Sequence, residues 1–90
     1  FKTIRAALKG DRDATRVGFI HSLGHGVGLT IGEKPYLSLF SDDVLRTNQV
    51  VTVEPGLYDP RVGGMRIEDT VLVKGRRVDN LTPLGKQLEI

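Results

Sequence analysis

Hydrophobic and polar residues follow a strand-like pattern most clearly in the second half of the chain. Residues 49–54 are rich in β-branched side chains, residues 65–74 alternate apolar and polar positions, and a shorter segment of the same kind covers residues 77–81. β-branched content and a period of two are typical of β-strands. A Pro-Gly pair follows the first segment and Gly75 separates the other two. The pattern therefore predicts three strands joined by turns.

The first half predicts one helix and long irregular connections. Residues 1–9 place Ile4 and Leu8 four positions apart and are followed by a glycine, which is typical of the end of an amphipathic helix. Residues 36–47 predict a long connection with one helical turn, and residues 58–64 predict a turn-rich loop. Together these elements predict an α+β chain with one N-terminal helix and an antiparallel sheet.

Two glutamates lie within the strand-like segments. Side chains alternate between faces along a strand, so Glu54 shares a face with Thr52, and Glu68 shares a face with Arg66. An open antiparallel sheet has one solvated face, and two ordinary surface glutamates would fit there equally well. Two features favour a functional role. Glu54 has no charged neighbour in the chain, and Arg66 lies one side-chain step from Glu68, where it can hold a carboxylate in place.

Both histidines lie in the segment His-Ser-Leu-Gly-His-Gly-Val-Gly-Leu, residues 21–29. His21 and His25 are four positions apart, but the glycines argue against a helix and no glutamate intervenes, so a helical zinc-protease motif is not indicated. The glycines lead into residues 29–35, which do not predict a helix, and a phosphate-binding loop is therefore not indicated either. The pattern alone leaves open whether each histidine is a structural group or a ligand.

Composition narrows the class of protein. The 90 residues carry a net charge of +2 and contain no cysteine. The basic residues are scattered among acidic ones, and the aromatic residues are two Tyr and three Phe, which argues against a nucleic-acid partner. No apolar run approaches the roughly 20 residues of a membrane span. We expect a cytoplasmic protein with no membrane partner, and we interpret the start at Phe1, within a helix-like segment, as a cut in a longer protein.

One imidazole and two carboxylates form a donor set that suits Mn, Co, Fe or Zn. Carboxylates can bridge two ions, and a paired metal site activates water and stabilises a developing oxyanion. Two ions need more than three ligands. None of the aspartates has ligand-like spacing in a strand except Asp69, which strand parity points away from Glu68. The chain by itself is therefore not expected to complete a two-metal site.

Three motifs occur in order along the chain: His21-Ser-Leu-Gly-His25-Gly-Val-Gly-Leu, Thr-Val-Glu54-Pro-Gly-Leu-Tyr and Arg66-Ile-Glu68-Asp. Together they resemble the C-terminal half of the proline-specific metallopeptidases, the Xaa-Pro aminopeptidases and Xaa-Pro dipeptidases (prolidases). The resemblance runs from about residue 19 to residue 84. It implies that residues 1–90 are the C-terminal half of a pita-bread catalytic domain, with a curved antiparallel sheet.

The resemblance also implies a role for each motif residue. His25, Glu54 and Glu68 match metal ligands, and Glu54 also matches a catalytic residue that takes part in proton transfer. His21 matches a catalytic histidine that lines the substrate pocket, and Arg66 matches the substrate-binding arginine of the proline-specific branch. The implied cofactors are two divalent metal ions, Mn²⁺ first, with Co²⁺ or Zn²⁺ as alternatives. The implied substrate is a peptide with proline at its second position.

Two departures from the family pattern matter. Gly32 stands where the family usually has a second pocket histidine. Two aspartate ligands belong to the first half of the fold, so this chain holds three of the five expected ligands. We therefore expect the chain alone to be inactive and to pair with its missing N-terminal half or to form a homodimer. The alternative is a pita-bread domain that has lost catalysis and serves in binding, which Gly32 favours and the three retained ligands oppose. A creatinase-like hydrolase without metal is a third interpretation, opposed by the same ligands.

Overall fold

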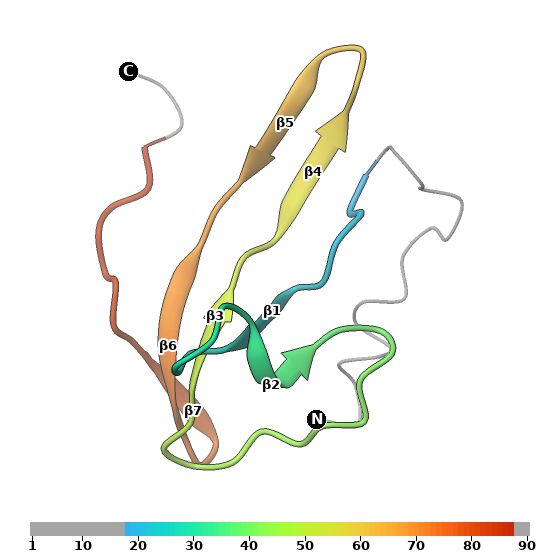
Figure 1. Cartoon of the computed structure of the whole chain (residues 1–90). Coiled ribbons are helices and arrows are strands. Elements are labelled where there is room, and N and C mark those ends of the chain that lie inside the picture. The colour runs from blue at the N-terminus through green and yellow to red at the C-terminus, as the bar shows by residue number, and fades with distance from the viewer. Residues whose placement is uncertain (1–17, 88–90) are drawn as a thin grey trace.

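The computed structural model describes residues 18–87, and this part of the chain is built from β-strands without a helix (Figure 1). The predicted helix at residues 1–9 lies outside the described residues. The strands are β1 (Gly24–Gly26), β2 (Glu33–Leu37), β3 (Val50–Val53), β4 (Gly56–Asp59), β5 (Gly63–Arg66), β6 (Asp69–Lys74) and β7 (Arg77–Asn80).

Five of the strands form one antiparallel sheet in the order β2-β1-β3-β6-β7, and β4 pairs with β5 in a two-stranded ribbon. Figure 1 shows this ribbon extending beyond the sheet as a continuation of β3 and β6. The sheet and the ribbon are thus two parts of one long antiparallel pair that is interrupted in the middle.

The interruption keeps the pairing register. Val53 and Asp69 form the last pair of β3 and β6, and the same register resumes in the ribbon. Carried one residue past that pair, it places Glu54 opposite Glu68. The backbone N–H of Ile67 donates to the carbonyl of the residue after Glu54 at 3.1 Å and holds the two chains together across the gap. The break therefore brings both predicted glutamates to one point.

The hydrophobic core is small and lies at the centre of the five-stranded sheet. Its buried members are Leu37, Val51, Val71 and Val73. Val51 lies directly opposite Val71 in the β3–β6 pair. On β6 the buried valines alternate with half-buried Thr70 and Leu72, which confirms the period of two expected for this strand. Thr52 is also buried, at 4% exposure, so β3 is covered on both of its faces.

Two of the sequence expectations were wrong about the second half. Residues 65–74 are not one strand, because β5 ends at Arg66 and β6 begins at Asp69. Residues 58–64 are not a loop, since most of them belong to the β4–β5 hairpin. The glycines there indicate a loop from sequence, yet Gly64 pairs with Tyr58, and a Cβ at position 64 would lie 2.3 Å from the tyrosine ring. The expected third strand, residues 77–81, is confirmed to within one residue by β7.

Strands β1 and β2 were not predicted. For β1 the reason is the close approach of neighbouring backbone to its glycines. A Cβ on Gly24 would lie 1.8 Å from the carbonyl oxygen of Thr52, and one on Gly26 would lie 2.2 Å from the carbonyl oxygen of Lys34. Strand β1 therefore needs glycine where backbones approach closely, and glycine is depleted in strands in general.

Candidate functional site

His25 lies in the middle of β1 between two buried glycines. Its backbone N–H donates to Thr52 Oγ1 at 3.1 Å, which ties β1 to β3 beside the ring. The ring Nδ1 lies 2.8 Å from the carbonyl oxygen of Gly26. Because a carbonyl oxygen can only accept, Nδ1 carries a proton in this contact, and Nε2 is the ring nitrogen that remains for a ligand. That Nε2 faces Glu54, at 3.5 Å from Oε1.

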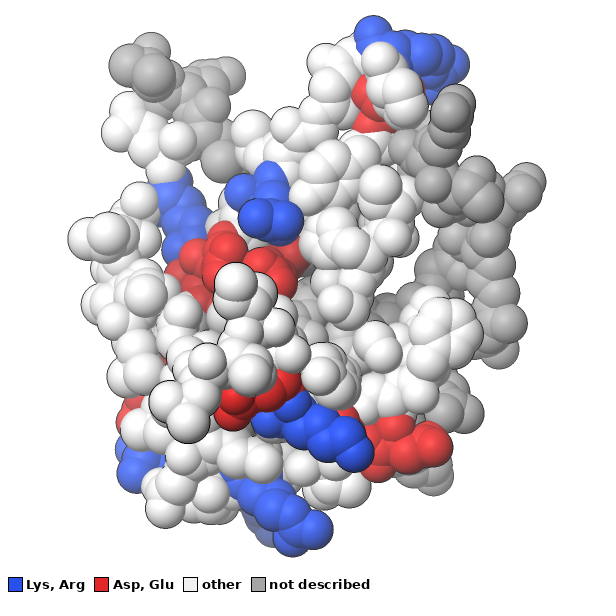
Figure 2. Space-filling view, in the orientation of Figure 1, with Lys and Arg blue, Asp and Glu red and all other residues white. Residues whose placement is uncertain are grey.

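Glu54 follows β3 directly, and its side chain is only 15% exposed. Arg66, the last residue of β5, brings its Nε to 4.0 Å from Glu54 Oε2. The sequence predicts that this arginine holds Glu68, whereas its ion pair in the structure is with Glu54. The break in the strands thus gathers His25, Glu54, Arg66 and Glu68. Figure 2 shows acidic side chains clustered beneath basic ones where β5 passes into β6.

The carboxyl group of Glu68 is perturbed by its surroundings. Partial burial and the neighbouring Glu54 carboxylate raise the pKa of Glu68, while Arg66 and His25 act in the opposite direction. Burial is the larger of the two effects, and the second carboxylate adds to it. Two carboxyl groups that share one site resist being ionised together. A divalent cation held by these groups would remove that conflict.

His21 lies apart from this cluster, beside β4. Gly18 and Tyr58 exchange two backbone hydrogen bonds, at 2.8 and 3.0 Å, and so hold the segment before β1 against β4. The His21 Nδ1 lies 2.6 Å from the carbonyl oxygen of Ser22, and its Nε2 lies 3.2 Å from the Tyr58 hydroxyl. Nδ1 must donate to the carbonyl, so Nε2 accepts from the tyrosine. The ring of Phe19 packs against the imidazole of His21, with centroids 5.0 Å apart.

Tyr58 was missed by the sequence analysis as a site residue, although it ends the motif that contains Glu54. The available signal was the Pro-Gly step before it. A Cβ on Gly56 would lie 2.6 Å from the Tyr58 hydroxyl and 2.8 Å from His21 Nε2. Glycine at position 56 therefore leaves the room in which the tyrosine and the histidine meet.

The cluster contains donors that suit a metal ion, but they do not form a complete metal site within the described residues. Among residues 18–87, no three His, Asp, Glu or Cys side chains converge closely enough to hold an ion. The donors themselves suit a hard or borderline divalent cation, since they are one neutral imidazole nitrogen and two carboxylates. Of these donors, His25 and Glu54 already face each other in the structure.

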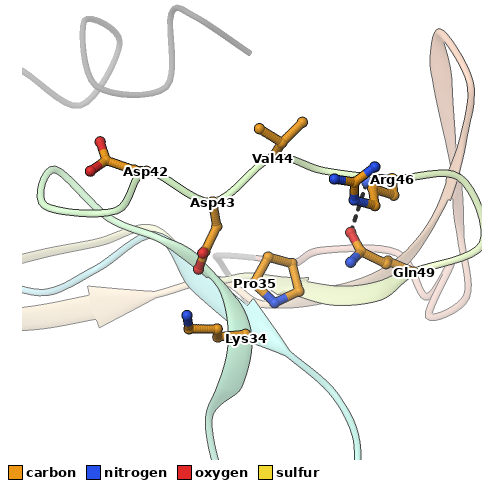
Figure 3. A pocket seen from close by; sticks show the side chains of 7 residues that line it. All are labelled: Lys34, Pro35, Asp42, Asp43, Val44, Arg46 and Gln49. Carbon is orange, nitrogen blue, oxygen red and sulfur yellow. Dashed lines mark hydrogen bonds between the residues drawn. The ribbon is translucent and has the colours of Figure 1, made fainter.

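A separate hollow of about 350 Å³ lies between β2 and the segment that follows it (Figure 3). Its lining residues are Lys34, Pro35, Asp42, Asp43, Val44, Arg46 and Gln49. The Asp43 carboxylate accepts the backbone N–H of Tyr36 at 2.9 Å, and this hydrogen bond lowers the pKa of Asp43. The backbone N–H of Arg46 donates to the Gln49 side chain at 2.7 Å. This hollow contains none of the motif residues.

Fold and cluster together define a class of protein. The sequence profile of metallopeptidase family M24 matches residues 2–75, which is most of the chain. The chain belongs to this family.

No helix in the described residues has both the length and the apolar character that a membrane crossing needs.

Individual relatives narrow the comparison. The chain is 51% identical over 70 residues to a Xaa-Pro dipeptidase of Pyrococcus furiosus, covering 78% of this chain and 20% of the relative. It resembles the solved structure of a Xaa-Pro dipeptidase from Bacillus anthracis with a TM-score of 0.75 and 48% identity, over 79% of this chain and 20% of that one. An X-Pro aminopeptidase structure from Thermotoga maritima gives a TM-score of 0.72 and 44% identity, over 78% and 20%. The chain therefore spans about one fifth of the length of these relatives.

Proposed function

We propose that this chain is the C-terminal part of a dinuclear-metal Xaa-Pro peptidase, whose whole protein hydrolyses the bond between an N-terminal residue and proline. The observation that carries the proposal is the meeting of His25 and Glu54 at the strand break, with Glu68 opposite Glu54. The names of the relatives, Xaa-Pro dipeptidase and X-Pro aminopeptidase, support the substrate class.

Each residue of the cluster has a role in this proposal. His25 Nε2 and the carboxylates of Glu54 and Glu68 hold the metal, and two further ligands come from the part of the protein outside this chain. Two bound divalent ions, with Mn²⁺ as the first candidate, would activate a water molecule and polarise the peptide carbonyl. When the ions are bound, Glu54 would be the group that takes up and returns a proton. Arg66, 4.0 Å from Glu54, orients this carboxylate and contacts the substrate.

His21 and Tyr58 form the wall of the proposed substrate pocket. The tyrosine hydroxyl donates to His21 Nε2 at 3.2 Å, and the Ser22 carbonyl fixes the other ring nitrogen. Both ring nitrogens are thus engaged and the imidazole is held in one orientation. A fixed ring positions a bound peptide without the entropy loss of ordering a mobile side chain.

The isolated chain is proposed to be inactive and to associate. Strands β2 and β7 are the edges of the sheet, and Leu57 and Met65 are exposed at 67% and 52% on the ribbon. Open edges and exposed apolar side chains favour pairing with another chain. The proposed partner is the missing N-terminal half or a second copy, and a monomer in sedimentation at tens of micromolar would contradict this part of the proposal.

We also place the protein in the cytoplasm, on the basis of its lack of cysteine.

The first experiment is a measurement of bound metal per chain after loading with Mn²⁺ and desalting. We expect near-stoichiometric Mn²⁺ only when the remaining ligands are supplied, and little retention by the chain alone. Tight retention of two ions by the chain alone would show that its own assembly completes the site, and hydrolysis of a Xaa-Pro dipeptide should then be assayed directly.

A segment exchange tests the catalytic roles. Residues 18–87 would replace the matching segment of the Bacillus anthracis Xaa-Pro dipeptidase, and Xaa-Pro hydrolysis would be measured with Mn²⁺. The proposal expects a folded, active hybrid whose activity falls by at least about 10²-fold in the Glu54→Gln variant. A folded hybrid that binds metal but shows no hydrolysis would favour the alternative, a pita-bread domain that serves in binding, which Gly32 also favours.

A further inference from the structure

The turn between β1 and β2 folds back over the His25 ring. His25 pairs with Tyr36, but the next residue, Gly26, pairs with Glu33, so β2 bulges at this point. Gly32 has a φ of +67°, and a Cβ placed there would lie 3.8 Å from Cγ of His25. The end of the turn therefore lies against the imidazole, on the strand that carries the proposed ligand.

Glu33 closes this turn with its side chain. Its Oε2 accepts the backbone N–H of Thr30 at 3.2 Å and the Thr30 hydroxyl at 3.1 Å. Gly28 lies under the same carboxylate, where a Cβ would come within 1.9 Å of Oε1. The Glu33 carboxylate thus lies against two positions of the turn, Gly28 and Thr30.

The same turn sets the proton position on His25. Gly26 supplies the carbonyl that accepts from Nδ1 at 2.8 Å, and Gly26 is the direct pairing partner of Glu33. The Tyr36 hydroxyl donates to the carbonyl of Gly32 at 3.1 Å and anchors the other end of the turn. The Gly26 carbonyl that contacts Nδ1 therefore lies directly before this closed turn.

We propose that Glu33 is a positioning residue for His25: by clamping Thr30 it holds the 27–32 turn so that Gly26 fixes the Nδ1–H tautomer and Nε2 faces Glu54. The importance of this geometry for metal binding rests on the proposed function, whereas the effect on the ring is independent of it. Ligating histidines in proteins are oriented by a hydrogen bond at the second ring nitrogen. Here the orienting carbonyl belongs to the backbone, and the carboxylate acts one step further away.

Histidine-selective ¹⁵N NMR of the 90-residue chain without metal tests the proposal. The chain has two histidines, so His21 serves as an internal reference in each spectrum. Spectra are recorded about 1.5 pH units above the usual imidazole pKa of about 6.5. The Nδ1–H form should dominate at His25 in the unmodified chain. In Glu33→Ala the population of the other tautomer should rise about fivefold, while the His21 signals stay unchanged.

Matched variants make the result decisive. Thr30→Val removes the hydroxyl donor and should shift His25 in the same direction by a smaller amount, and it carries the test if Glu33→Ala does not fold. Glu33→Gln keeps a side-chain acceptor and should restore the tautomer seen in the unmodified chain. Asp43→Asn removes a carboxylate that bonds the neighbouring Tyr36 N–H and should leave His25 unchanged. Unchanged His25 signals in Glu33→Ala and Thr30→Val, or equal changes at both histidines, would overturn the proposal.

Discussion

The imidazole Nε2 of His25 lies 3.5 Å from Oε1 of Glu54, and this contact joins β1 to the end of β3. The hydroxyl oxygen of Thr52, on β3, accepts the backbone N–H of His25 at 3.1 Å. The strand pair is thus fixed two residues before the carboxylate that faces the ring. The contact is a property of how β1 lies against β3, and it follows that changes in this packing should alter the site.

Replacement of Thr52 by Val should destabilise the chain. The substitution keeps the volume of the side chain but removes the acceptor for the His25 N–H, which is left unpaired in a buried strand. We expect the free energy of unfolding to fall by about 1–3 kcal/mol, measured by urea denaturation. Thr70→Val is the control, because Thr70 lies opposite Thr52 and its hydroxyl has no hydrogen-bond partner within residues 18–87. Equal effects of the two variants would contradict this account.

Removal of the Tyr58 hydroxyl should release His21. In Tyr58→Phe the ring contact with His21, at a centroid distance of 5.4 Å, is retained and the hydrogen bond at 3.2 Å is lost. A double-mutant cycle with His21→Ala should give a coupling energy of about 0.5–1.5 kcal/mol by urea denaturation, the usual net contribution of one such bond. Additive effects of the two substitutions would show that the hydroxyl and the imidazole do not interact in solution.

The stability of the chain should respond to pH through Glu68. Because the pKa of Glu68 is raised in the folded chain, folding favours its protonated form. The associated stability is complete below the unfolded pKa, about 4.3, and is lost as the pH rises through the folded pKa. Glu68→Gln should therefore have a higher urea midpoint than the unmodified chain at pH about 7, and the difference should vanish near pH 3.

Asp43 gives the control of opposite sign for that measurement. Its pKa is lowered by the Tyr36 N–H bond, so its contribution is present above the unfolded pKa and lost as the pH falls through the folded one. Asp43→Asn should thus lower the urea midpoint at pH about 7. If Glu68→Gln also lowered the midpoint there, the proposed repulsion between the two glutamates would be wrong.

A side chain at position 32 should be costly because of the backbone. The φ of +67° at Gly32 lies in the left-handed region, whereas a Cβ there would make only an ordinary contact with the His25 ring at 3.8 Å. Gly32→Ala and Gly32→His should each cost about 1–2 kcal/mol, and Gly32→Asn less, since asparagine tolerates this conformation. Gly85→Ala, at a glycine with open space around it, should change stability by less than about 0.5 kcal/mol. Restoring the family's usual histidine at position 32 is thus opposed by the turn itself.

Local pattern was a good guide where strands have ordinary side chains. Val71 and Val73 alternate with polar or half-buried neighbours, and β3 and β7 follow the predicted segments to within one residue at each end. Local pattern failed at β1 and in the β4–β5 hairpin. In both, glycine is required because a carbonyl group or an aromatic ring from another strand occupies the place of a Cβ, and that neighbour is invisible in the local sequence.

The sequence by itself determined the chemical inventory of this protein: two histidines, two motif glutamates and an arginine, in an order that identifies a family. Strand parity also placed Glu54 on one face with Thr52, and Glu68 on one face with Arg66. Only the tertiary structure decided that the register runs unbroken through the gap, so that these glutamates stand opposite each other, that Arg66 pairs with Glu54, and that Tyr58 meets His21. The physical reason is that such contacts join strands distant in sequence, and their geometry is set by strand register and backbone approach, which no single segment encodes.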